Sequence, residues 1–186
     1  MKQPFEEPNN GQLKGRKVKD VYKKVYDVRN TFFLDQTGQF PTRSHRGSKY
    51  LMVMVEIDSN DILVEPLKSR KDPELARAYR AMMLMLKRSG IVPQKHILEN
   101  EVSKAMRDII RDKYNMEMEL VPPGCHRRNA AEVSNRNFKA HFLSVLDGTA
   151  DDFLPSLWDR LIPQAEITVN LLRQLNATPN VLAYAR

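Results

Sequence analysis

The sequence predicts an α/β fold with one mixed five-stranded sheet, in which three antiparallel strands precede a strand–helix alternation and helices cover both faces. Three observations predict it. Apolar runs near the start are joined by turn-forming residues, later short strands alternate with amphipathic helical patterns, and the helices carry clear start and stop signals. Antiparallel strands followed by strand–helix alternation are typical of one sheet with helices packed on its faces.

The first three strands come from apolar runs in the first part of the chain. Residues 30–41 predict a strand that ends on Asp35, beside a turn rich in Gly and Pro. Residues 49–57 and 62–67 are two further apolar runs, and residues 58–61 between them are typical of a hairpin turn. Asp35 therefore stands at the head of three consecutive strands.

The first long helix has the clearest boundaries. Asp72 is predicted as its N-cap, Pro73 as its first residue and Glu74 as a first-turn acid, while Gly90 and Pro93 end it. Its apolar face is predicted to be core and consists of Leu75, Tyr79, Met82, Met83 and Leu86.

The second half alternates strands and helices. Residues 96–98 predict a short strand that leads into Glu99, and apolar residues at helical spacing then mark a helix through Val102, Met106, Ile109 and Ile110. Residues 116–120 predict a fifth strand. A helix follows Asn129, and a last helical region over residues 157–175 is broken at Pro163.

The stretch from Val121 to Glu132 carries the most chemical information. Its Pro/Gly loop forces a turn, and Asn129 is the predicted N-cap of the next helix, so Glu132 falls in the first turn. This geometry suits a metal-dependent nuclease face. Asn129 and Glu132 also match a capping box, in which the glutamate only satisfies backbone N–H groups, and both interpretations stay open. At helical spacing one face carries Glu132, Asn135, Arg136 and Lys139, and a different face, predicted to be buried, carries Ala131, Phe138, Phe142 and Val145.

Composition favours a polyanionic partner. The 186 residues are 41% hydrophobic and carry a net charge of +7, which fits one domain and a polyanionic partner. The domain is expected over residues 26–186, after a basic tail or linker over residues 1–25. The single cysteine, Cys125, excludes a disulfide framework. The absence of a signal peptide and of a long apolar run predicts a protein that is intracellular, neither secreted nor in a membrane.

Several separate stretches of the chain resemble one protein family. The chain is similar to the catalytic core of a copia-type long-terminal-repeat retrotransposon integrase, whose fold is ribonuclease-H-like, from about Tyr26 to Tyr184. The resemblance rests on residues 34–41, 50–55, 57–60, 98–101, 121–123, 126–132, 138–142 and 157–161, in this order.

The resemblance implies a catalytic and metal-binding triad of Asp35, Glu99 and Glu132. In such a site the three carboxylates hold two Mg²⁺ ions, for which Mn²⁺ substitutes, and catalyse DNA 3′-end processing and strand transfer during DNA integration. Glu99 departs from the pattern, because family members have aspartate there. The longer side chain moves the carboxylate outward by about 1.5 Å, one C–C bond, and a misplacement of about 1 Å can cost about a hundredfold in rate.

The resemblance also implies partners. Arg127, Arg128, Asn135, Arg136 and Lys139 are expected to bind DNA at the element ends and the target, and the basic side chains among them contact phosphates. A homo-oligomer released from a polyprotein, in the nucleus or in a cytoplasmic virus-like particle, is expected. The chain contains neither the zinc module nor the C-terminal extension of complete integrases, which predicts a core fragment or a remnant.

Other titratable residues are assigned simpler roles. Asp58 is interpreted as a turn residue rather than a further metal ligand, and His126 as a surface-loop histidine. Glu56, Asp61 and Glu101 are not distinguished from hydrated surface acids.

Three functions remain open from sequence alone. They are an integrase core whose activity is impaired by Glu99, a catalytically inactive DNA-binding remnant of the same fold, and a ribonuclease H acting on RNA–DNA hybrids. The ribonuclease would require an acid on the first long helix that faces the metal site, and Glu74 is better explained as an acid that complements the helix dipole.

Overall fold

The central sheet contains five strands, as predicted. The computed structural model describes residues 30–98, 102–121 and 130–176, and the predicted tail over residues 1–25 lies outside this part of the chain. The strands are β1 (Thr31–Gln36), β2 (Tyr50–Glu56), β3 (Ile62–Leu67), β4 (Lys95–Leu98) and β5 (Glu117–Leu120).

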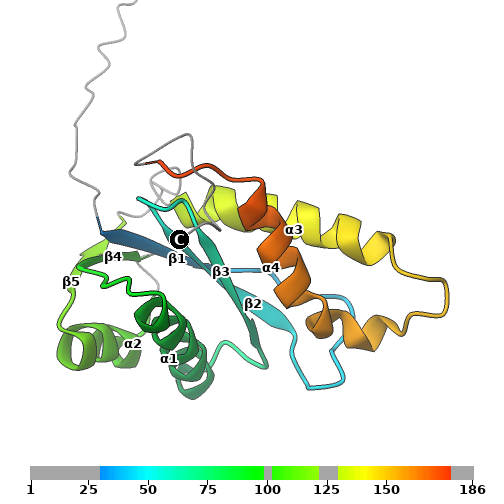
Figure 1. Ribbon diagram of the computed structural model, residues 1–186. Coiled ribbons are helices and arrows are strands. Elements are labelled where there is room, and N and C mark those ends of the chain that lie inside the picture. Colours follow the sequence, from blue (N-terminus) through cyan, green and yellow to red (C-terminus); the bar gives the residue numbers. More distant parts are fainter. Residues whose placement is uncertain (1–29, 99–101, 122–129, 177–186) are drawn as a thin grey trace, which may run out of the picture.

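The strand order is β3-β2-β1-β4-β5, and the sheet is mixed. β2 pairs antiparallel with β1 and with β3, whereas β4 is parallel to β1 and β5 is parallel to β4. β1 is therefore the central strand, and its carboxyl end lies beside the carboxyl end of β4 (Figure 1). This arrangement confirms the predicted α/β class with an open mixed sheet.

Helices cover both faces of the sheet (Figure 1). On one face lie α1 and α2, the latter continuing as the single π-helical turn η1. On the other face lie α3, the short 3₁₀ helix η3 and α4. Their bounds are α1 Asp72–Arg88, α2 Lys104–Asp108, η1 Ile109–Lys113, α3 Ala130–Asp147, η3 Pro155–Arg160 and α4 Ile162–Leu171.

Alternation along β2 divides the interior into two cores. Met52 and Met54 pack toward α1 and α2, whereas Leu51, Val53 and Val55 pack toward α3 and α4. Successive side chains of a strand point to opposite faces, so a strand that is apolar at every position must be covered on both sides. The first core contains all five predicted apolar residues of α1; the second contains Phe138, Phe142, Trp158, Ile162, Ala165 and Val169.

The start of α1 differs from the prediction by one residue. The N-cap is Lys71, whose side chain makes no capping hydrogen bond, and Asp72 is the first helical residue. Asp72 and Glu74 still complement the helix dipole from the first turn. At the other end Gly90 adopts φ +73°, the left-handed conformation that stops a helix, as predicted.

The turn between β2 and β3 corrects the expectation for Glu56. Its side chain is buried, and its carboxylate accepts hydrogen bonds from the backbone N–H groups of Asp58 and Ser59 at 3.1 and 2.6 Å. Glu56 therefore organises the turn rather than facing water. Asp58 is a turn residue as predicted, and its Oδ2 accepts from the backbone N–H of Asn30 at 2.7 Å. Glu101 lies outside the described residues.

Candidate functional site

Asp35 lies at the carboxyl end of the central strand. It is the penultimate residue of β1, and its neighbour across the antiparallel pair is Val53 of β2. The side chain is partly buried, and its Oδ1 accepts a hydrogen bond from the backbone N–H of Gln36 at 2.7 Å. The carboxyl ends of the parallel strands of an open α/β sheet are where such folds place their ligands, so Asp35 stands where a site is expected.

Asn135 of α3 is the partner of Asp35. Its Nδ2 donates a hydrogen bond to Asp35 Oδ2 at 2.7 Å, across a separation of 100 residues in the sequence. Phe138 and Phe142, buried in the second core, hold α3 against the sheet and so set this contact. The contact brings the predicted polar face of α3 to the end of β1.

Glu132 lies in the first turn of α3, one turn before Asn135, and its side chain is exposed. Side chains three positions apart on a helix are neighbours, with about 5–6 Å between their Cβ atoms. The structure therefore brings two of the three predicted triad residues, Asp35 and Glu132, to one end of the sheet. The predicted N-cap Asn129 lies outside the described residues, so the capping-box interpretation stays open.

Glu99, the third predicted triad residue, lies outside the described part of the chain. The strand before it is described: β4 ends at Leu98 and runs parallel to β1, with Phe33 opposite Ile97.

Some of the predicted DNA-binding residues lie in the described part of the chain and others do not. Arg136 and Lys139 are exposed on α3, beside the Glu132–Asn135 face. Arg127 and Arg128 lie outside the described residues, as do His126 and Cys125. Asn135 lies on the same face, and its Nδ2 is the donor to Asp35 Oδ2.

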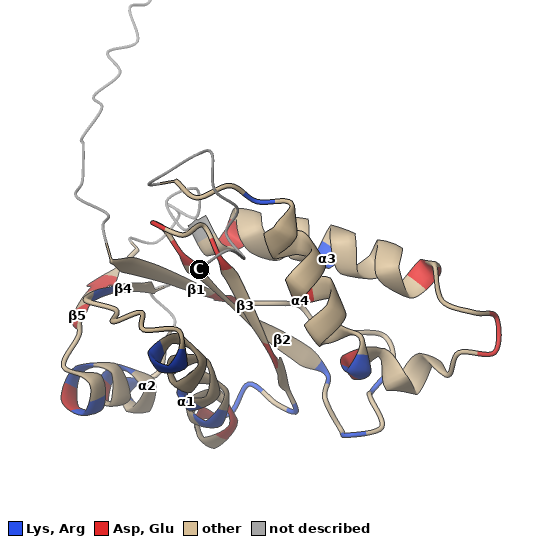
Figure 2. Ribbon diagram, in the orientation of Figure 1, with Lys and Arg blue, Asp and Glu red and all other residues tan. Residues whose placement is uncertain are grey.

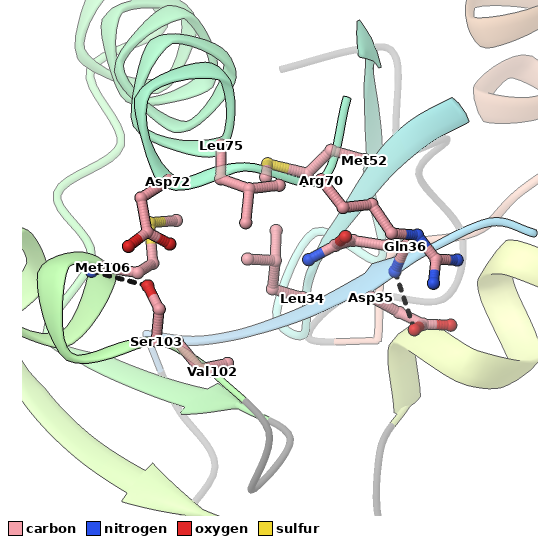
Figure 3. A pocket seen from close by; sticks show the side chains of 10 residues that line it. All are labelled: Leu34, Asp35, Gln36, Met52, Arg70, Asp72, Leu75, Val102, Ser103 and Met106. Carbon is pink, nitrogen blue, oxygen red and sulfur yellow. Dashed lines mark hydrogen bonds between the residues drawn. The ribbon is translucent and has the colours of Figure 1, made fainter. Parts of the chain in front are cut away.

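A cavity of about 330 Å³ adjoins Asp35 on the side of α1 and α2 (Figure 3). Residues from β1, β2 and the starts of α1 and α2 line it. They are Leu34, Asp35, Gln36, Met52, Arg70, Asp72, Leu75, Val102, Ser103 and Met106.

Sequence reasoning missed two charged residues of this cavity, Arg70 and Asp72. Arg70 Nη2 donates to the backbone carbonyl of Thr37, and the guanidinium carbon lies 5.0 Å from the centre of the Tyr50 ring. For Asp72 the sequence predicts only a capping role. The available signal was the place of both residues at the junction of β3 and α1, because loops at the carboxyl end of a strand commonly carry functional residues.

Basic residues surround this end of the molecule. Figure 2 shows Lys and Arg in the loop from β1 to β2 and in the segment from β3 to α1. Arg43, Arg46, Lys49 and Arg70 form no salt bridge with any carboxylate of the described residues, so their charge is available to a polyanion.

The donor set fits a hard divalent cation. Asp35 and Glu132 offer carboxylate oxygens, which Mg²⁺ prefers, and a carboxylate has about four lone-pair sites, of which Gln36 and Asn135 use two at Asp35. Within the described residues no three His, Cys, Asp or Glu side chains converge on one point. Glu99 is outside that set, so two of the three residues predicted as ligands, Asp35 and Glu132, are described.

None of the helices in the described ranges is long and apolar enough to cross a membrane.

No known family model matches the chain, and no curated protein sequence matches it.

Proposed function

We propose that this chain is the catalytic core of a retroelement-type integrase with a ribonuclease-H-like fold, a metal-dependent polynucleotidyl transferase that processes and joins DNA ends. The observation that carries the proposal is the hydrogen bond between Asn135 Nδ2 and Asp35 Oδ2 at 2.7 Å. It holds the acid-bearing face of α3 against the acid at the end of the central strand, which is the arrangement that a two-metal carboxylate site requires.

The topology supports the same proposal. Three antiparallel strands are followed by two strands parallel to β1, in the order β3-β2-β1-β4-β5, with helices on both faces. This is the arrangement implied by the resemblance to integrase cores. Fold alone does not determine function, so the carboxylates of Asp35 and Glu132 are what favour this activity over others.

Asp35, Glu132 and Glu99 are the residues that would hold two Mg²⁺ ions. When bound, such ions activate a water or a DNA 3′-hydroxyl and stabilise the departing oxygen of the phosphodiester. Gln36 and Asn135 fix the Asp35 carboxylate from two sides, so one of its rotamers is selected before any ligand arrives. Arg136 and Lys139, exposed beside this face, position the strand through its phosphates without reading its sequence.

The experiment that tests the proposal is joining of short duplex DNA ends in Mg²⁺ or Mn²⁺. Wild type is expected to join ends, and Asp35→Asn is expected to abolish joining because a neutral amide is a poor ligand for a hard cation. Glu132→Gln is expected to reduce joining by at least a hundredfold while leaving the melting temperature unchanged, since glutamine serves a capping box equally well. Glu99→Asp is expected to raise the rate.

The matched control is Asp151→Asn, which makes the same charge change at an exposed residue in the turn after α3. It is expected to join DNA as wild type does. Equal joining activity of Asp35→Asn and wild type would contradict the assignment of Asp35 as a metal ligand. A folded, DNA-binding protein that is inert in both wild-type and Glu99→Asp forms identifies the inactive remnant instead.

A ribonuclease H is the second candidate, and one observation favours it: Asp72 at the start of α1 lines the same cavity as Asp35. Two observations count against it. Figure 3 shows Asp72 and Asp35 on opposite sides of the cavity, and Glu74 instead pairs with Arg77 at 3.0 Å. Cleavage of the RNA strand of an RNA–DNA hybrid, lost in Asp72→Asn, would establish this function in place of DNA joining.

A further inference from the structure

The cavity beside Asp35 has an apolar floor. Leu34, Met52, Leu75 and Met106 form it, and each of these side chains is buried. They come from β1, β2, α1 and α2, so the floor is built by the first core at its exposed end. Methionines adapt their shape to flat ligands and contact aromatic rings favourably.

The size of the cavity limits its occupant. At about 330 Å³ it lies at the lower end of the ~300–1,000 Å³ range of small-molecule sites. One heterocyclic base with part of its sugar suits this volume, whereas a duplex or a folded peptide does not.

The two ends of the cavity carry different charged side chains. Figure 3 shows Asp72 on the side of α1 and α2, facing Ser103 and Met106, and Asp35 with Gln36 and Arg70 on the other side. The Asp35 carboxylate turns toward α3, where Asn135 binds it, so the charged group that marks this end of the cavity is the Arg70 guanidinium. At the other end Asp72 repels phosphate, but its carboxylate accepts hydrogen bonds from amino groups. A nucleotide therefore fits in one direction, with its base toward Asp72 and its phosphate toward Arg70.

We propose that this cavity binds one unstacked nucleobase bearing an exocyclic amino group, from the DNA strand whose phosphodiester is held at Asp35. The role in catalysis rests on the function proposed above. Asp72 accepts hydrogen bonds from the base, Arg70 contacts the phosphate, and the apolar floor covers the ring. Guanine is the preferred base, because its adjacent N1–H and N2–H groups match the two oxygens of a carboxylate, whereas thymine offers a single N–H.

An unpaired strand end supplies such a base without the cost of unstacking it from a duplex. The cavity therefore favours DNA ends that carry a single-stranded nucleotide beside the reacting phosphate. It also gives the site a sequence preference that phosphate contacts alone cannot provide.

The test is a titration of the full chain, with ¹³C-labelled methionine methyl groups, by dGMP and by dTMP in the presence of EDTA. Met52 and Met106 line the cavity, while Met54 and Met82 are fully buried in the same core but do not line it. We expect dGMP to shift the Met52 and Met106 signals and not those of Met54 and Met82. Asp72→Asn is expected to lower the affinity for dGMP at least fivefold. The wild-type protein is expected to bind dTMP at least fivefold more weakly than dGMP.

Asp151→Asn is the control for the charge change and is expected to bind dGMP as wild type does. The proposal is overturned by unchanged Met52 and Met106 signals, by equal dGMP affinity of wild type and Asp72→Asn, or by equal affinity for dGMP and dTMP. Because this titration needs neither metal nor turnover, its result is independent of the joining assay. If DNA joining depends on Asp35 but dGMP does not bind, only the proposed base site is contradicted. If dGMP binds but DNA ends are not joined, only the proposed integrase function is contradicted.

Discussion

At the scale of single residues, the carboxylate of Asp35, which we propose as a metal ligand, is held by two hydrogen bonds. Gln36 holds one oxygen through its backbone N–H, and Asn135 holds the other through its side-chain amide, both at 2.7 Å. Both donors are neutral, so neither adds a positive charge beside the carboxylate. A salt bridge in the same place would cancel the charge that a cation needs.

His96 is a second residue with a defined electrostatic consequence. It lies on β4, is completely buried, and its Nδ1 is 3.1 Å from the hydroxyl of Tyr79, while its Nε2 has no hydrogen-bond partner in the described part of the protein. Burial lowers the pKa of His96 from its ordinary value of 6.5 to about 3. The folded protein therefore requires neutral His96.

The folded state should lose stability on acidification through this histidine. Between about pH 6.5 and pH 3, His96 binds a proton in the unfolded chain but stays neutral in the folded chain. His96→Gln keeps an acceptor for Tyr79 but has no proton to bind. Between pH 7 and pH 5, wild type should lose about 2 kcal/mol more unfolding free energy than His96→Gln. Urea unfolding of both proteins at the two pH values measures the difference.

His45→Gln is the control, because His45 is exposed in the loop after β1. It should follow the wild-type pH profile. Parallel profiles of wild type and His96→Gln would show that the acid sensitivity arises elsewhere.

At the scale of elements, α4 protects the edge of the sheet. β3 is an edge strand, and an edge strand exposes backbone groups that can pair with another chain. Asn170 of α4 accepts from the backbone N–H of Ile62 at 3.0 Å and donates to its carbonyl at 2.8 Å, and Glu166 accepts from the N–H of Val64 at 2.8 Å. Two side chains of a helix thus replace part of a neighbouring strand.

Glu166 makes this contact dependent on pH. Burial raises its pKa to about 7, assisted by the carboxylates of Asp61 and Glu65 and opposed by the hydrogen bond from Val64. Since the folded-state value lies above the ordinary 4.5, stability falls as pH rises from about 4.5 to 7. Glu166→Gln keeps the acceptor without the charge, and should gain about 1–2 kcal/mol at pH 8 and nothing at pH 4.

Urea unfolding at pH 4 and pH 8 measures the gain. The control is Glu117→Gln, at an exposed residue of the other edge strand, β5, which should show no such gain. An equal gain at both pH values would mean that glutamine packs better, and the charge argument would fail.

Periodicity and turn chemistry predicted the order of all these elements because both signals are local. The apolar runs of β2 and β3 and the boundaries of α1 needed no distant information. The errors also have local causes. Asp72 is of a residue type that favours the N-cap position, but the N-cap is Lys71. Glu56 cannot be told from a hydrated surface acid by sequence, because only the folded turn brings the backbone N–H groups of Asp58 and Ser59 to its carboxylate.

At the scale of the whole molecule, the site lies where the two cores meet the carboxyl end of β1. Sequence predicted Asp35 at the end of a strand and Glu132 and Asn135 on one face of a helix, as the structure has them. It could not predict that Asn135 touches Asp35, because that contact depends on how α3 packs across 100 residues of intervening chain. Nor could it predict that Arg70 and Asp72 line one cavity with Asp35, since this cavity exists only once α1 and α2 cover the sheet.

We propose that Asp35 and Glu132 bind the same divalent cations, and Mn²⁺ binding followed by electron paramagnetic resonance shows whether they do. This measurement requires neither DNA nor any further domain. Wild type and Asp151→Asn should bind Mn²⁺ with equal affinity and release it to excess Mg²⁺, whereas Asp35→Asn and Glu132→Gln should each bind at least tenfold more weakly. Mn²⁺ affinity that is the same in wild type, Asp35→Asn and Glu132→Gln would contradict the metal-dependent site proposed for this protein.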